Sequence, residues 1–155
     1  MSRAFVKEDG PEVVSLPDLP VSPGPNWVTP EGLSSLHARL AARQADLAAL
    51  RARPERLDRL PEAAAERDVR YLEARLGSAV VVEPVAAPDA VAFGVRVTVD
   101  DGGRARTFRV VGEDEADPAG GLITPRSPLA RALMGARAGD EVEWRGGSLI
   151  VTGLG

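Results

Sequence analysis

TPEGLSSLHARLAARQADLAALRAR, residues 29–53, predicts the first long helix of the chain. Thr29 is a good N-cap, Pro30 suits the first helical position, and Glu31 is favourable at the positive end of the helix dipole. Arg43 interrupts the apolar stripe once, so the pattern is heptad-like but broken. The stripe itself recurs at alternating steps of three and four residues, at Leu33, Leu36, Leu40, Leu47 and Leu50.

A second helix is expected from about Pro61 to Leu76, with Gly77 as its C′ residue. Pro54 should end the first helix or kink it. Each apolar stripe is too narrow to bury itself, so we expect the two helices to pack as an antiparallel hairpin, a short coiled coil. One bent helix docked on the rest of the chain is the alternative.

Residues 1–28 contain five prolines and show no sustained helical or strand period, which predicts a flexible, Pro-rich tail. Trp27 is the one large apolar residue near its boundary. This side chain either pins the tail to the folded part or sits half exposed.

From residue 79 onward the apolar residues alternate as they do in strands. Ser127-Pro128 opens a helix of one or two turns that closes at Gly135. The acidic stretch Glu113-Asp114-Glu115 is interpreted as a solvated loop, with a site for arginines of a partner as the alternative. The expected strands are residues 79–83, 93–99, 107–111, 122–123, 141–144 and 148–151.

These patterns predict an α+β fold: an N-terminal antiparallel helical hairpin followed by an antiparallel β domain with one short helix. The predicted domains are the tail at 1–28, the hairpin at 29–77 and the β domain at 78–155.

The formal net charge of −4 argues against direct gripping of a nucleic-acid backbone, which usually needs a basic surface. We therefore expect a protein partner. The chain has no cysteine, and His37 is its one histidine, so thiolate and His-rich metal sites are excluded. No apolar run has the length of a signal peptide or a membrane span, so we expect a cytoplasmic protein without membrane contact.

Five motifs in the C-terminal half follow one another in a fixed order. They are FGVRVTV at 93–99, VVGEDEAD at 110–117, LIT at 122–124, SPLARALMG at 127–135 and GDEV at 139–142. Together they resemble the C-terminal domain of the GreA/GreB transcript-cleavage factors over residues 79–155. The Thr-Pro-Glu-Gly start of the hairpin also resembles the N-terminal half of that family.

The resemblance implies an FKBP-like β domain that anchors at the rim of the secondary channel of bacterial RNA polymerase, while the hairpin enters the channel. In the family, acidic residues at the hairpin tip help to hold a second Mg²⁺ ion, and the polymerase itself hydrolyses backtracked RNA. A non-enzymatic monomer with no cofactor of its own and no direct sequence-specific nucleic-acid binding is therefore expected. Polymerase contacts are expected at Ser127, Pro128, Leu129 and Arg131, although the Ser-Pro pair is equally explained by helix initiation alone.

The tip, RPERLDRLPE at 53–62, departs from the family signature Gly-Asp-Leu-Ser-Glu-Asn-Ala-Glu-Tyr. Its candidate acids are Glu55, Asp58 and Glu62, whose spacing and order differ from the family's pair. Arginines crowd the same loop and would repel a metal ion, and the hairpin is several turns shorter than that of a full family member. We therefore predict weak or absent stimulation of transcript cleavage.

Three alternatives remain open. The tip carboxylates could still support Mg²⁺ and make the chain an active cleavage factor. The FKBP-like domain could be a peptidyl-prolyl isomerase, although the sequence offers few aromatics beyond the tail to line a pocket. The heptad-like stripe could instead mediate a free-standing dimer.

Overall fold

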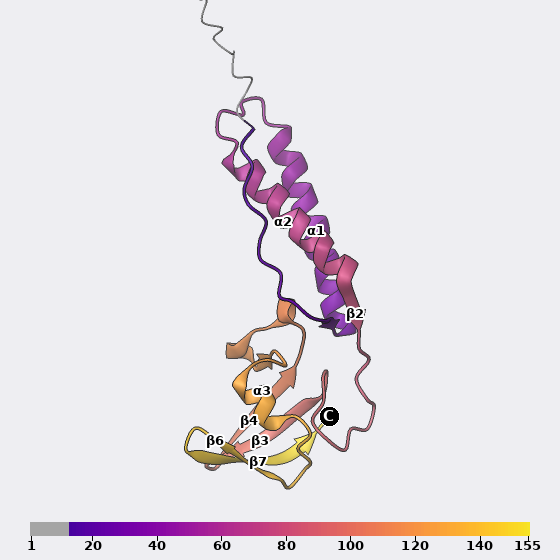
Figure 1. Cartoon of the computed structure of the whole chain (residues 1–155), viewed down its shortest axis with the longest axis vertical. Helices are drawn as coiled ribbons and strands as arrows, with labels where there is room; N and C mark the ends of the chain where they lie inside the picture. Colours follow the sequence, from indigo (N-terminus) through magenta and orange to yellow (C-terminus); the bar gives the residue numbers. More distant parts are fainter. Residues whose placement is uncertain (1–12) are drawn as a thin grey trace, which may run out of the picture.

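The computed structural model describes residues 13–155; residues 1–12, part of the predicted tail, lie outside the described residues. Helices α1 (Pro30–Arg51) and α2 (Leu60–Ser78) form an antiparallel hairpin that stands on a β domain (Figure 1). The predicted N-cap of α1 is confirmed, because the Thr29 hydroxyl accepts a hydrogen bond from the Gly32 amide at 3.0 Å. The seam between the helices buries Leu36, Leu47, Ala63, Ala65 and Leu72.

Gly77 lies inside α2, so its prediction as the C′ residue is wrong. Side chains satisfy the last carbonyls of the helix in place of a left-handed glycine. The Ser78 hydroxyl donates to the Ala74 carbonyl at 3.0 Å, and the Asn26 amide donates to the Arg75 carbonyl at 2.8 Å. The chain can therefore pass directly from helix into strand.

Two sheets are present in the described part of the chain. The small sheet pairs β1 (Asn26–Val28) in parallel with β2 (Ala79–Val81) at the base of the hairpin. The large sheet has the order β5-β4-β3-β7-β6. Its strands are β3 (Arg96–Asp101), β4 (Arg104–Val110), β5 (Leu122–Ile123), β6 (Glu141–Trp144) and β7 (Gly147–Leu154).

Strand β5 departs from the expected antiparallel pattern, because it pairs with β4 in parallel. The connection between them contains two short 3₁₀ turns, Glu113–Glu115 and Pro118–Gly120, which bring the chain back to run in the same direction. The other pairs of the large sheet are antiparallel, as predicted.

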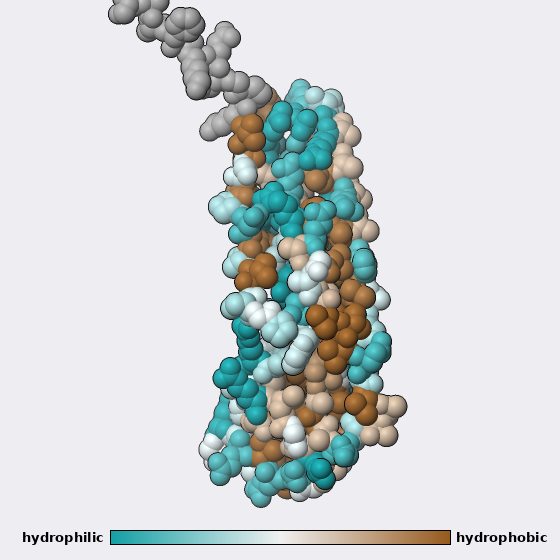
Figure 2. Space-filling model, turned by 45° about the vertical axis from the view of Figure 1, so that its right-hand side comes forward, coloured by the Kyte–Doolittle hydropathy of each residue, from teal (hydrophilic) through white to brown (hydrophobic). Residues whose placement is uncertain are grey.

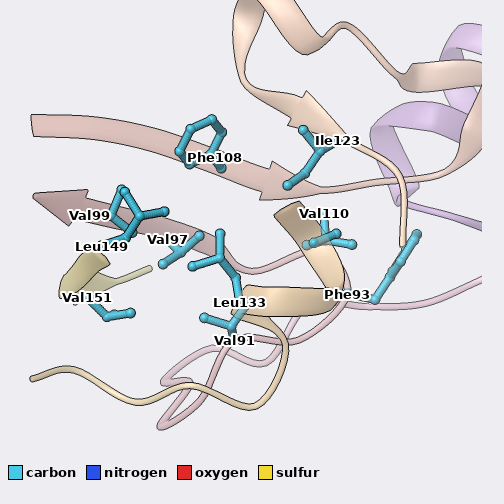
Figure 3. Packing of buried hydrophobic residues seen from close by; sticks show 11 residues of the cluster. Val91, Phe93, Val97, Val99, Phe108, Val110, Ile123, Leu133, Leu149 and Val151 are labelled. Atoms are coloured by element: carbon cyan, nitrogen blue, oxygen red, sulfur yellow. The ribbon is translucent and has the colours of Figure 1, made fainter. Parts of the chain in front are cut away.

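Helix α3 (Pro128–Leu133) completes the β domain and packs its Leu133 among valines of the sheet (Figure 3). Its predicted cap is confirmed, since the Ser127 hydroxyl accepts from the Ala130 amide at 3.2 Å. The predicted apolar face of residues 93–99 is buried throughout, although the strand itself begins only at Arg96.

Residues 26–28, assigned to the tail from the sequence, form strand β1. Both predictions for Trp27, that it pins the tail and that it sits half exposed, are confirmed. Its ring packs edge-to-face on Phe93, with 5.9 Å between the centroids, and yet it remains 42% exposed. The tail therefore enters the fold at the junction between hairpin and β domain.

The acidic turn, Glu113-Asp114-Glu115, joins the β domain to the hairpin. Its interpretation as a solvated loop is wrong for Asp114, whose side chain is only 5% exposed. One Asp114 oxygen accepts from the Arg75 Nε at 2.6 Å, and the other accepts from the Tyr71 hydroxyl at 2.5 Å. Arg75 is 3% exposed and also donates to the Asn26 side-chain oxygen at 2.6 Å.

Glu115 binds the start of α1 in the same turn. Its carboxylate accepts from the Thr29 amide and from the Gly112 amide, both at 3.1 Å, and also from the Thr29 hydroxyl. A Cβ at Gly32 would lie 2.1 Å from the Glu115 carboxyl carbon. Any side chain at this position in the first turn of α1 would displace the Glu115 carboxylate from its hydrogen bonds to Thr29.

Removing Asp114 should leave the buried Arg75 guanidinium without its closest carboxylate, with Glu113 at 3.6 Å as its remaining ion-pair partner. We expect Asp114→Ala to lower the free energy of unfolding by about 3–5 kcal/mol. Asp101→Ala is the matched control, because Asp101 pairs with Arg106 at 3.2 Å on an exposed face, where a pair contributes about 1 kcal/mol or less. Urea denaturation compares the two variants; equal losses would contradict a buried connection.

Burial, together with the hydrogen bond to Asp114, raises the pKa of Tyr71 from 10.0 to about 12. The raised pKa favours the neutral phenol in the folded state, so its contribution to stability is complete below pH 10 and is lost as the pH rises toward 12. Tyr71 is the only tyrosine in the sequence, so ultraviolet titration of phenolate reports it alone. We expect a midpoint about two pH units higher in the folded protein than in urea; coincident midpoints would refute the contact.

Candidate partner-binding surfaces

Two separate regions contain the residues that the sequence singled out: the hairpin tip, residues 52–62, and the start of helix α3. The tip lies at the far end of the arm from the β domain (Figure 1), and hydrophilic residues cover much of the surface there (Figure 2). At 1.5 Å per residue, the 22 residues of α1 and the 19 of α2 give arms of about 33 and 28 Å.

Glu62 is buried at the tip and is held by arginines. Its carboxylate accepts from the Arg56 Nε at 2.7 Å and from a second Arg56 nitrogen, and Arg53 lies 3.6 Å away. The Arg56 hydrogen bonds, helped by the charge of neighbouring arginines, lower the pKa of Glu62 to about 2. A bidentate pair of this kind occupies the oxygens that a metal ion would need.

Asp58 also has a local role. Its Oδ1 accepts from the Leu60 amide at 2.9 Å and so satisfies one of the unpaired N–H groups at the start of α2, whose N-cap position is Arg59. Arg53 donates to the backbone carbonyl of the same residue at 3.2 Å. Glu55 is exposed and makes no ion pair with any described residue.

The three predicted tip acids therefore do not act as a set. No group of three His, Asp or Glu side chains that could hold a metal ion exists among residues 13–155. Sequence spacing could not show this, because the ion pairs of Glu62 depend on the fold of the loop.

The second region is a hollow of about 310 Å³ beside the start of α3. Ser127, Pro128 and Leu129 line it, whereas Arg131 is exposed and is not part of the lining. The Ser127 hydroxyl is already used to cap α3. Ser127 therefore contributes to a partner contact by holding the turn in a fixed shape, not by a hydrogen bond to the partner. Three of the four predicted partner-binding residues thus share one surface.

Sequence reasoning missed the aromatic walls of this hollow, Phe108 and Trp144. They reach it from strands β4 and β6 rather than from loops. The Arg106 guanidinium lies over the Phe108 ring at 5.0 Å, and the Arg145 guanidinium lies over the Trp144 ring at 5.1 Å. Arg106 stands two residues before Phe108, and Arg145 directly follows Trp144. This close spacing of arginine and aromatic was the signal available in the sequence. The hollow is therefore apolar within and carries positive charge at its edges.

No helix in the described part of the chain is both long enough and apolar enough to cross a membrane.

Comparison with known proteins places these features in a family. A sequence model described as "Transcription elongation factor, GreA/GreB, C-term" matches residues 86–152. Transcription elongation factor GreB of Xanthomonas axonopodis pv. citri is 39% identical over 139 residues, covering 75% of this chain and 80% of that protein.

Other relatives match the C-terminal half. Transcription elongation factor GreB of Neisseria meningitidis serogroup B is 49% identical over 80 residues, 50% of this chain and 49% of that protein. GreA of Cereibacter sphaeroides is 42% identical over 77 residues, so the matched region spans about half the length of both relatives.

Among solved structures, the GreA factor homolog 1 of Thermus thermophilus is 22% identical, with coverage of 85% of this chain and 99% of that chain and a TM-score of 0.38. Such a score supports no argument about geometry. The family assignment comes from the sequence relatives: the chain belongs to the GreA/GreB family of transcription elongation factors.

Proposed function

We propose that this chain binds bacterial RNA polymerase, with its arm in the secondary channel and its β domain at the rim, and that it stimulates transcript cleavage weakly or not at all. It regulates elongation by occupying the channel. Any hydrolysis of RNA belongs to the polymerase, and the chain brings no cofactor of its own.

The observation that carries this proposal is the ion-pair cluster around Glu62. A carboxylate that supports Mg²⁺ must offer a free oxygen about 2.0–2.1 Å from the ion. The Glu62 oxygens are held by Arg56 instead, and the arginines would repel the incoming cation. Asp58 is engaged with the backbone of α2.

Arm length supports the same conclusion. With helices of about 33 and 28 Å, the tip stops several turns short of what the family resemblance implies for a full cleavage factor. Of the three tip acids, Glu55 alone makes no ion pair with a described residue. In the alternative function, an active cleavage factor, Glu55 would be the carboxylate that supports Mg²⁺.

The hollow beside α3 supports binding at the rim. Its apolar interior and two edge arginines suit a protein segment with exposed apolar and acidic side chains. The same hollow could hold a proline-containing peptide, so an isomerase assay on a proline peptide separates the two uses; turnover there would support the isomerase alternative.

Transcript cleavage tests the function directly. On backtracked complexes of the cognate polymerase we expect saturable binding with RNA 3′ ends no shorter than in its absence, beside brisk shortening by a family cleavage factor. Shortening that is lost in Glu55→Gln would establish the active alternative. No binding at all would refute the proposed function.

Polymerase affinity should fall when the hollow is altered without loss of the α3 cap. We expect Leu129→Ala to weaken binding roughly tenfold, as truncation of an apolar contact residue often does. Ser127→Asp should leave thermal stability nearly unchanged, because aspartate also caps helices, whereas Ser127→Ala should cost about 1 kcal/mol of stability. Binding titrations and thermal melts measure both; full affinity of Leu129→Ala would exclude the hollow as the docking site.

A further inference from the structure

Residues 13–25, here called the strap, run in an extended conformation along the hairpin, from its tip to its base (Figure 1). Midway, Arg70 of α2 holds the strap in two ways. Its Nε donates to the Asp18 carboxylate at 2.7 Å, and a second guanidinium nitrogen donates to the Leu16 carbonyl at 3.0 Å. The strap is thus bound to the outer face of the hairpin through both side chain and backbone.

At its lower end the strap is tied to the β domain. Arg126 donates to the Pro23 carbonyl, and Gly24 then turns the chain with a φ of +99°, a value that favours glycine. Asn26, the first residue after the strap, accepts a hydrogen bond from Arg75 at 2.6 Å. The strap therefore ends in the same cluster that connects arm and β domain.

At its upper end the strap meets the tip. Val13 and Val14 line a hollow of about 290 Å³ together with Arg56, Arg59 and Glu62. The first described residues of the chain thus lie against the ion-pair cluster that occupies Glu62.

Between these ends the strap passes the point where the apolar seam of the hairpin is interrupted by the ion pair of Arg43. Arg43 breaks the apolar stripe of α1 and pairs with Asp68 of α2 at 2.9 Å. Leu19 of the strap lines one hollow together with this pair and with Tyr71 and Leu72. The strap therefore places a half-buried apolar side chain near the point where the stripe of α1 is interrupted.

The prolines of the strap favour this arrangement. Pro17, Pro20, Pro23 and Pro25 limit the unfolded conformations of the segment, so less entropy is lost when it docks. They also lack N–H groups, so fewer backbone donors need a partner against the helices.

We propose that the strap is a third element of the arm, which enters the polymerase channel together with the hairpin and adds a contact surface for the protein wall at the leading end. This inference rests on the proposed function. Val13 and Val14 are then carried beside the hairpin tip, so the upper end of the strap meets the polymerase where the arm reaches deepest.

Introduced cysteines test the docked strap in the free protein, because the sequence has no cysteine of its own. Spin labels on Val13→Cys and Leu57→Cys, the latter in the hairpin loop, should give one short, narrow distance distribution. Asp18→Arg should broaden it, and adding Arg70→Asp should narrow it again in part, because the reversed pair restores the ion pair but not the hydrogen bond to the Leu16 carbonyl. A broad distribution without the charge change would overturn the proposal.

Proximity cleavage tests the strap on the polymerase. An iron chelate that generates hydroxyl radicals is attached to Val13→Cys, to Leu57→Cys or, as a β-domain reference, to Arg104→Cys. We expect the cuts from positions 13 and 57 to coincide and to differ from those of position 104. Cuts from 57 alone, or cuts from 13 that match those of 104, would refute the strap proposal and leave the proposed function standing. Absence of cuts from both 57 and 104 would refute the function and the strap proposal with it.

Discussion

A buried ion pair between Arg75 and Asp114 connects the arm to the β domain, and the geometry of the whole molecule depends on it. Removing two charges from water costs several kcal/mol per ion, which a bare pair does not recover. Here the Tyr71 hydroxyl donates to Asp114 and the Asn26 oxygen accepts from Arg75, and no buried side-chain nitrogen or oxygen of the described residues lacks a hydrogen-bond partner. Such a network tolerates one arrangement, and this fixes the direction of the arm relative to the sheet.

The same chemistry recurs at the opposite end of the arm with a different consequence. Glu62 is paired with Arg56 about as closely as Asp114 is paired with Arg75, and Arg53 lies 3.6 Å away, but here the pairing closes a loop within the hairpin rather than joining two domains. In both places arginines of the chain itself occupy the carboxylates. The net charge of −4 therefore does not translate into a set of free carboxylates at the tip, where Glu55 alone makes no ion pair with a described residue.

Features with local causes were predictable from the sequence. The caps at Thr29 and Ser127 and the strand alternation depend on residues a few positions apart, and the structure contains them. Partners distant in sequence were not predictable. A run such as Glu113–Glu115 looks the same whether it is solvated or bound to a helix end nearly ninety residues away, as Glu115 is to Thr29. Gly32 could be read only as a weak helix residue until the carboxylate that it accommodates was located.

The two candidate surfaces impose opposite demands on the proposed function. Docking at the hollow beside α3 fixes the β domain, while reach into a channel depends on the length of the arm. Because the buried connection at Arg75 leaves little freedom between them, a shortened hairpin cannot recover its lost reach by tilting or sliding. Under the proposed function, a chain with this anchor, a rigid connection and a short arm would therefore occupy the channel without reaching the catalytic metal. The arginine-rich tip agrees with that proposal, because a tip that does not meet Mg²⁺ need not keep its carboxylates free.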